Sequence, residues 1–262
     1  MIGFLAAIGR WTARGLASIG ALARFAFDAL ASVGTLPGAG RRVAVRVLLN
    51  QLRFTALEAV GLIVLLSGVL SYLTISSTVA QLDQVGASEL IGQLMVVVIV
   101  RELGPLLTAL AIVGRSGTAI TAELATNTVM GEVRALKGMG IDPYHYLVLP
   151  RLIGCVVSVA VLMIVFDVVA VAGGYLAAAT IGGMSAARYM GIVVSNLTTQ
   201  DVVLTVLKGF LFGAVVGVIP AYEGLSVRRG PTEIPQAVIR GTVGSITAIF
   251  IFAALIVGAT RA

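Results

Sequence analysis

The amino-acid sequence predicts an all-α, polytopic membrane protein with five transmembrane helices, and three observations lead to this prediction. Of the 262 residues, 58% are hydrophobic and only 11% are charged, whereas a soluble domain normally has about 25% charged residues. A chain this apolar cannot bury its hydrophobic residues in one soluble core, because a soluble protein of this size still needs a polar surface. The apolar residues also gather in five runs, each close to the ~20 residues that a helix needs to cross the hydrocarbon layer.

The first 56 residues are predicted to form an arm that lies along the membrane surface. Apolar residues recur there at near-helical spacing, Arg10 and Arg14 share one helix face, and the single tryptophan, Trp11, suits the headgroup layer. This pattern predicts an interfacial amphipathic helix, which the glycine- and proline-containing stretch 34–40 ends. A generic anchor without a mechanistic role is the alternative interpretation.

The five predicted spans follow the arm. Together with the arm, they take up most of the chain and leave little for a second domain. We therefore expect one domain over residues 1–262, with the interfacial arm at 1–56 and the transmembrane bundle at 57–260. The spans are predicted at residues 57–76, 90–113, 152–172, 201–222 and 241–260.

The distribution of basic residues predicts the orientation of the bundle. Fourteen of the 18 lysines and arginines lie in the N-terminal arm or in the segments 114–151 and 223–240. Basic residues concentrate on the cytoplasmic side of membrane proteins. We therefore expect a cytoplasmic N-terminus and a C-terminus on the opposite side. The same rule explains the net charge of +6 without a nucleic-acid partner.

Several classes of site are excluded by composition. The single cysteine, Cys155, cannot form an intrachain disulfide, and with the single histidine, His145, it cannot build a zinc site of Cys and His. An ATP-binding P-loop needs Gly-Lys followed by Ser or Thr, but the two lysines, Lys137 and Lys208, are each followed by glycine. We expect no metal, no cofactor and no enzymatic activity in this chain.

The segment 131–150, between the second and third spans, predicts a short cytoplasmic helix. It mixes apolar and charged residues, glycines mark its end, and an Asp-Pro pair suits the start of the next helix. A short exposed helix beneath a bundle can insert into a groove on a partner protein, although a solvated connector is the alternative. The candidate coupling residues are Glu132, Arg134, Ala135, Leu136, Gly138, Met139, Gly140, Asp142 and Pro143.

Charged residues inside the predicted spans are candidate functional residues. Each costs about 2.5–3.5 kcal/mol to insert, so it needs a partner or a hydrated cavity. Arg101 and Glu102 point in different directions on a helix, and Pro105 predicts a kink or local opening beside them. The two residues either face a central cavity and meet a lipid headgroup, or belong to an ion-pair network that fixes helix packing.

Two further patterns concern the packing of the third and fourth spans. Asp167 and Lys208 are expected at similar depth in the bilayer, which predicts a structural ion pair between them. Gly209, Gly213 and Gly217 recur every fourth residue and form one stripe that another helix can approach closely. Packing within the chain is favoured over a contact between two copies.

Short strings across the chain resemble the MlaE/YrbE family of ABC-transporter permeases. Within the coupling segment, Glu132 and Gly138 match the permease motif, whereas Val133 and Arg134 replace two alanines and the Leu-Pro arrives one residue early. The resemblance covers roughly residues 40–260. The strings are Arg101-Glu102-Leu103-Gly104-Pro105, Gly114-Arg115-Ser116-Gly117-Thr118-Ala119, Thr121-Ala122-Glu123, Gly140-Ile141-Asp142-Pro143 and Pro150-Arg151.

This resemblance implies a multi-pass permease of the bacterial inner membrane that moves phospholipid or a related lipid. It implies a second permease protomer in a homodimer or pseudo-dimer, a cytoplasmic ABC ATPase that binds ATP and Mg, a STAS-domain protein, and a periplasmic ring of MCE-domain subunits. The resemblance also implies a lipid pathway, for which the candidate residues are Tyr72, Ile75, Val79, Leu82, Arg101 and Glu102.

Two other function classes are alternatives to the permease. An ion-coupled secondary transporter could use Arg101, Glu102, Asp167 and Lys208 as a proton relay, although five spans offer no obvious pair of inverted repeats. An intramembrane enzyme is poorly supported, because no His pair, metal-ligand cluster or Ser/His constellation occurs.

Overall fold

A computed structural model gives the fold of the chain and describes residues 20, 22, 24–25, 48–82, 90–228 and 230–261. The described part is built from helices, and five helical segments in it are long and apolar enough to cross a membrane. The predicted all-α fold with five spans is therefore confirmed. The predicted interfacial helix of the N-terminal arm lies largely outside the described residues.

Four of the five long segments join several helical stretches end to end, and the fourth segment is a single helix. The first three contain π-helical stretches, which are wider than an α-helix and occur often at functional sites. The longest single helix is α8 of the third segment, with 34 residues. The bounds are η2 (Arg53–Leu57) and α3 (Glu58–Leu82); α4 (Leu90–Leu94), η4 (Met95–Leu103), α5 (Gly104–Ile112), η5 (Val113–Gly117) and α6 (Thr118–Val129); η6 (Tyr144–Val148) and α8 (Leu149–Gly182); α10 (Thr199–Leu225); η7 (Pro231–Glu233) and α11 (Ile234–Arg261).

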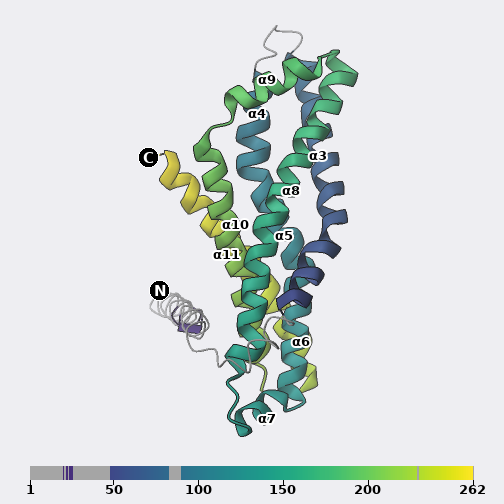
Figure 1. The fold of residues 1–262 in the computed structure, drawn as a ribbon. Helices are drawn as coiled ribbons and strands as arrows, with labels where there is room; N and C mark the ends of the chain where they lie inside the picture. Colours follow the sequence, from purple (N-terminus) through teal and green to yellow (C-terminus); the bar gives the residue numbers. More distant parts are fainter. Residues whose placement is uncertain are drawn as a thin grey trace, which may run out of the picture.

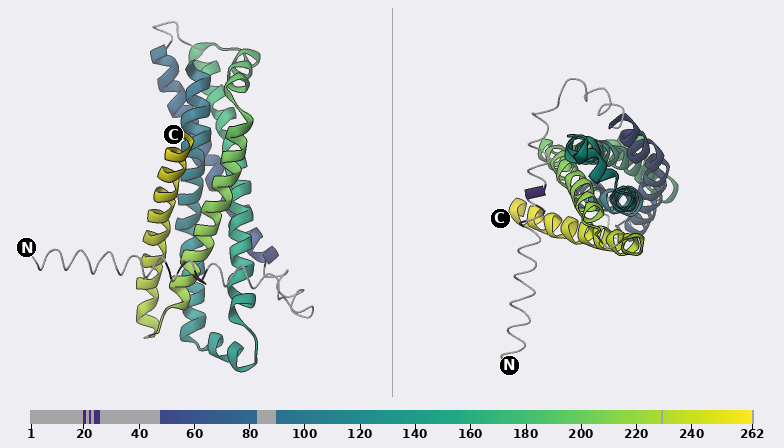
Figure 2. Two further views of the ribbon diagram at one scale, coloured as in Figure 1. Left: turned by 90° about the vertical axis from the view of Figure 1, so that its left-hand side faces the viewer. Right: turned by 90° about the horizontal axis from the view of Figure 1, so that it is seen from below.

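Helix α8 is the centre of the bundle. It packs mainly against α3 and α10, and α10 packs in turn against α6 and α11. Helix α11 stands on the outside of the bundle (Figure 2). The short helix α7 (Glu132–Gly138) lies at one end of the molecule and α9 (Ala186–Asn196) at the opposite end (Figure 1). These two positions define an α7 end and an α9 end.

Glycines allow α8 and α10 to approach each other at backbone distance. A Cβ atom on Gly213 would lie 2.6 Å from the Cα of Val156, and one on Gly209 would lie 2.9 Å from the Cα of Ala160. The third glycine of the stripe, Gly217, faces Leu152. All three contacts are with α8 of the same chain, so the stripe serves packing inside the protomer.

The second span is longer than predicted. Residues 114–129 were expected in a cytoplasmic loop, but the helix continues to Val129 before Gly131 ends it with a φ of +82°. The hydroxyl groups of Thr118, Thr126 and Thr128 each donate to the carbonyl oxygen four residues earlier. Because these polar side chains are satisfied by their own helix, they do not stop it.

Helix α9 was not predicted from the sequence. Ser185 caps its start by accepting the backbone N–H of Arg188. Tyr189, which is only 1% exposed, anchors the helix against Gly174 of α8. Burial raises the pKa of the Tyr189 phenol to about 12, so this anchor stays uncharged. The helix covers the α9 end of the bundle.

Candidate functional site

The centre of the candidate site is a break in the hydrogen bonding of the second span. The π-helical segment η4 ends where Gly104 and Pro105 begin α5. Proline has no N–H to donate to the carbonyl oxygen four residues earlier, which belongs to Arg101. The ammonium group of Lys208 on α10 donates to this oxygen at 2.6 Å. The local opening predicted at Pro105 therefore receives a side chain from another helix.

Lys208 also forms an ion pair, and its partner differs from the predicted one. Its Nζ lies 3.2 Å from Oε2 of Glu102, and its side chain is only 3% exposed. Oδ1 of Asp167 is buried and has no hydrogen-bond partner. The predicted Asp167–Lys208 pair is therefore wrong. Asp167 and Lys208 were expected to pair because of their similar depth in the bilayer. Lys208 instead points toward η4.

Arg101 is paired with Asp201, a residue that was not among the predicted site residues. Nη2 of Arg101 donates to Oδ1 of Asp201. The other oxygen of Asp201 accepts the backbone N–H of Thr198 at 2.9 Å and its hydroxyl at 2.8 Å, which forms a capping box at the start of α10. The Thr-x-x-Asp spacing before an apolar run is a signal that could have identified Asp201.

The two ion pairs together join η4 to α10. The neighbouring residues Arg101 and Glu102 reach Asp201 and Lys208, which lie two turns apart on α10, or about 10 Å. Two cations and two anions are thus neutralised in a segment that is otherwise apolar. Of the two roles considered for Arg101 and Glu102, the described contacts are those of an ion-pair network.

An apolar cavity of about 550 Å³ lies between α8, α9 and α10, toward the α9 end. Two of its lining residues are sequence neighbours of the charged network. Val100 directly precedes Arg101, and Val202 directly follows Asp201. Asp167 is the one ionisable residue in its lining. The lining residues are Val100, Ile164, Asp167, Val168, Val171, Ala172, Met190, Val193, Val194, Leu197, Val202, Thr205 and Val206.

Replacing Asp167 by leucine is expected to stabilise the folded chain by about 1–3 kcal/mol, because the change removes a buried oxygen that has no hydrogen bond. Unfolding temperatures of the purified variants in detergent measure this effect. The Asp167→Asn variant is the control, since it keeps the polar group and should gain little. A leucine variant that unfolds at a lower temperature than the natural chain would contradict this account of Asp167.

The proton relay suggested for an ion-coupled transporter is not continuous in the described part of the chain. Arg101, Glu102 and Lys208 belong to the network, but no hydrogen bond or ion pair joins Asp167 to them. Asp167 instead lies against Gly104, where a Cβ atom would be 2.8 Å from its Oδ1. The relay therefore receives no support from these contacts.

The predicted lipid-pathway residues of α3 occupy different surroundings. Ile75 and Val79 are 0% and 1% exposed and belong to the core. The prediction that these two residues line a lipid pathway is wrong for this chain, because neighbouring helices already cover both side chains. Tyr72 is 39% exposed, and the side chain of Leu82 lies outside what the structure describes. No face of α3 could be preferred from its residues, since beyond Glu58 the helix carries no charged side chain that would mark one side.

The predicted coupling segment forms the α7 end of the molecule. Helix α7 is exposed along one side, whereas Val133 and Leu136 pack against the core. Met139 ends the helix and is 66% exposed, and Gly140 follows with a φ of +75°. Asp142 then accepts the backbone N–H of Tyr144 at 3.0 Å. The segment is thus a short, anchored projection. Its candidate partner-facing residues Glu132, Arg134, Ala135 and Gly138 are exposed.

Two ion pairs near the α7 end were also missed from the sequence. Arg115 pairs with Glu58 and donates to the carbonyl oxygen of Phe54 at 3.0 Å. Arg151 pairs with Glu123 at 2.6 Å. Each pair joins residues from different spans, and only the fold brings such residues together. Among the described residues, no group of three His, Cys, Asp or Glu could hold a metal ion.

Comparison with known proteins identifies the family. The family described as Permease MlaE matches residues 48–258, which include the charged network, the cavity and α7. The chain belongs to the MlaE permease family. The resemblance seen in the sequence is thereby confirmed, and the chain is a membrane permease by family.

Relatives in this family come from bacteria and from a plant. A probable ABC transporter permease of Rickettsia conorii is 30% identical over 93% of this chain and 92% of its own length. The intermembrane phospholipid transport system permease protein MlaE of Haemophilus influenzae is 28% identical over 81% of this chain and 83% of its own length. The chloroplastic protein trigalactosyldiacylglycerol 1 of Arabidopsis thaliana is 28% identical over 78% of this chain and 58% of its own length.

Proposed function

We propose that this MlaE-family chain is the permease subunit of an ABC transporter that moves phospholipid or a related lipid. The observation that carries the proposal is the apolar cavity of about 550 Å³ directly beside the network of Arg101, Glu102, Asp201 and Lys208. A lipid combines an apolar chain with a polar headgroup, and this arrangement offers an apolar wall and charged groups within one turn of each other. The names of the Haemophilus and Arabidopsis relatives agree with a lipid.

The energy for transport comes, in this proposal, from a separate cytoplasmic ATPase that binds ATP and Mg. Helix α7 is the coupling helix, since it projects from the end of the bundle opposite to α9 and exposes Met139 and Arg134. Its attachment to the core through Val133 and Leu136 would transmit force from the ATPase to α6 and η6. Glycines with positive φ on both sides fix where the helix begins and ends.

The proposal includes the remaining partners and the orientation. The chain pairs with a second permease protomer as a homodimer in the bacterial inner membrane, with its N-terminus and α7 in the cytoplasm and its C-terminus in the periplasm. The α9 end then faces a periplasmic ring of MCE-domain subunits, which exchanges lipid with the permease. A STAS-domain protein binds on the cytoplasmic side. The predicted concentration of basic residues at the α7 end supports this orientation.

A Met139→Lys variant is expected to lose both binding of the ATPase and ATP-dependent lipid transfer, by about tenfold or more, because a charge replaces an exposed apolar contact of the coupling helix. Co-purification of the ATPase and transfer of fluorescent phospholipid from proteoliposomes measure the two effects. The fold should be unaffected, since Met139 is not part of the core.

Met130→Lys is the matched control for this experiment. Met130 is 72% exposed, ends α6, and precedes Gly131, whereas Met139 ends α7 and precedes Gly140. The two variants therefore make the same change at equivalent helix ends. Transfer that continues without the ATPase, or equal losses in both variants, would refute the proposed coupling through α7.

A further inference from the structure

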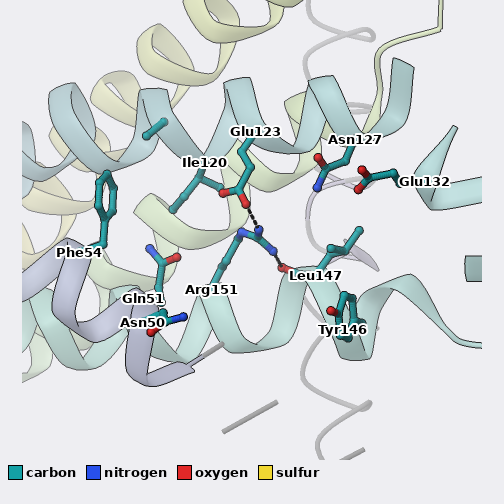
Figure 3. A pocket seen from close by; sticks show the side chains of 11 residues that line it. Asn50, Gln51, Phe54, Ile120, Glu123, Asn127, Glu132, Tyr146, Leu147 and Arg151 are labelled. Atoms are coloured by element: carbon teal, nitrogen blue, oxygen red, sulfur yellow. Dashed lines mark hydrogen bonds and ion pairs between the residues drawn. The ribbon is translucent and has the colours of Figure 1, made fainter. Parts of the chain in front are cut away.

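A second cavity, of about 530 Å³, lies near the α7 end and has a different character from the apolar one. Its walls come from the beginning of the first span, from α6, and from η6 with the beginning of α8 (Figure 3). Charged and amide side chains share its lining with apolar ones. The lining residues are Asn50, Gln51, Phe54, Ala119, Ile120, Glu123, Asn127, Glu132, Tyr146, Leu147 and Arg151.

The middle of this cavity is formed by a buried guanidinium group. Arg151 is only 6% exposed. Its Nη2 lies 2.6 Å from Oε1 of Glu123, and its Nη1 donates to the carbonyl oxygen of Leu147 at 2.5 Å. The Nε atom is buried and has no hydrogen-bond partner. Because a guanidinium has five N–H groups, these two contacts leave donors unused at a nine-tenths buried cation.

One end of the cavity is rich in acceptors. Figure 3 shows Glu132 and Tyr146 at this end, with Asn127 between them and the Arg151–Glu123 pair. Glu123 and Asn127 are four residues apart and so share a face of α6. Within the described part of the chain, no ion pair or hydrogen bond engages the carboxylate of Glu132. A carboxylate beside an amide and an aromatic ring suits an ammonium group.

The opposite end of the cavity combines apolar and amide side chains and lies close to the membrane. Asn50 and Gln51 share it with the apolar residues. Phe54 and Ile120 lie on this side of the Arg151–Glu123 pair (Figure 3). Phe54 comes three residues before the apolar run at 57–76, and Arg151 immediately precedes the run at 152–172. The cavity is therefore at the level where the hydrocarbon layer gives way to headgroups. Along its length it presents apolar and amide groups, then a cation, then an anion.

We propose that this cavity binds the zwitterionic headgroup of an aminophospholipid, that is, a phosphate followed by a primary ammonium group. The phosphate accepts from the unused donors of Arg151, the ammonium donates to Glu132 and Asn127, and the glycerol end of the lipid lies along Phe54 and Ile120. A phosphoglycerol headgroup lacks the cation that Glu132 requires. A phosphocholine headgroup has no N–H to donate. The proposal does not depend on the proposed transport function, because it concerns equilibrium binding to this chain alone.

The full-length chain, purified in a neutral maltoside detergent, is the material for the test. Binding of dihexanoyl phosphatidylethanolamine, dihexanoyl phosphatidylglycerol and free phosphoethanolamine is measured by isothermal titration calorimetry. We expect the phosphatidylethanolamine to bind about tenfold more tightly than the phosphatidylglycerol, since a charge-assisted hydrogen bond is lost with the latter. Free phosphoethanolamine should bind more weakly than the lipid, because it lacks the part that contacts Phe54 and Ile120.

Asn127→Lys is the most specific variant. It places an ammonium group inside the cavity four residues from Glu123, where the two side chains can pair on α6 without strain. It should fold normally and weaken binding of phosphatidylethanolamine at least about tenfold. Glu123→Gln should weaken binding too, because it removes the carboxylate that orients the Arg151 guanidinium. An unfolding temperature equal to that of the natural chain separates this effect from a loss of fold.

Glu58→Gln is the matched control. Glu58 and Glu123 are both paired with an arginine, their side chains are 52% and 56% exposed, and both lie toward the α7 end, but Glu58 does not line the cavity. Binding should be unchanged in this variant. Equal affinity for the two lipids, or full binding by a folded Asn127→Lys variant, would overturn the proposal. If free phosphoethanolamine binds as tightly as the lipid, the natural ligand is not a lipid, and that part of the proposal is refuted.

Discussion

A Lys208→Met variant is expected to lose about 3 kcal/mol of folding free energy, or more. Its ammonium group is buried, pairs with Glu102, and donates to the carbonyl oxygen that Pro105 leaves without a helical donor. Removing one partner of a buried ion pair typically costs about 3–5 kcal/mol, because the other charge remains buried and uncompensated. We place the loss at the lower end of this range, since a quarter of the Glu102 side chain is exposed.

Denaturant unfolding of the purified chain in detergent micelles measures this loss, and a double variant tests its cause. Lys208→Met combined with Glu102→Gln should recover a large part of the stability, because no charge is then left unpaired. Lys137→Met removes the other lysine, which is exposed on α7, and should leave stability unchanged. If the double variant is as unstable as the single one, the cost arises from something other than the Glu102 pair.

A Gly213→Leu variant is expected to separate α8 from α10 and to lose at least about 3 kcal/mol of stability. A Cβ atom at this position would lie 2.6 Å from the Cα of Val156 and 3.0 Å from the carbonyl oxygen of Cys155. Both are backbone atoms and cannot rotate away as a side chain can. Overpacking a core typically costs about 1–3 kcal/mol and sometimes more, and here the two helices must move apart as a whole.

Yield of monodisperse protein and its unfolding temperature report the effect of Gly213→Leu. Gly61→Leu is the control, because Gly61 lies within α3 and a Cβ atom there meets nothing within 4 Å. That variant should be neutral or slightly stabilising, since leucine favours a helix more than glycine does. A Gly213→Leu chain that is as stable as the Gly61→Leu chain would mean that α8 and α10 are not in backbone contact.

The helices could be predicted from the sequence because length and hydropathy alone determine whether a segment can span a bilayer. The stripe of Gly209, Gly213 and Gly217 was informative for a similar reason, since spacing along one helix defines a face. The partner of Lys208 could not be predicted. Depth along the bilayer normal follows from residue count, but the direction in which Lys208 points depends on how α10 is rotated against η4.

The remaining differences also have local physical causes. Residues 114–129 carry many polar groups and so resemble a loop, yet their threonine hydroxyls are satisfied within the helix. Ile75 and Val79 could not be assigned to a face, because α3 has no polar side that would indicate its orientation. The Thr-x-x-Asp spacing marks Asp201 as a helix cap and does not reveal a partner on another span. The second role of Asp201 depends on Arg101, 100 residues earlier.

The two oxygens of Asp201 have a consequence for motion in the bundle. One oxygen holds the first turn of α10 together through Thr198, and the other holds Arg101 of the neighbouring span. Fraying of α10 at this end breaks the contacts of one Asp201 oxygen, and sliding of the second span past α10 breaks the contact of the other. The two movements are cooperative, and any step that loosens one helix at this level lowers the barrier for displacing the other.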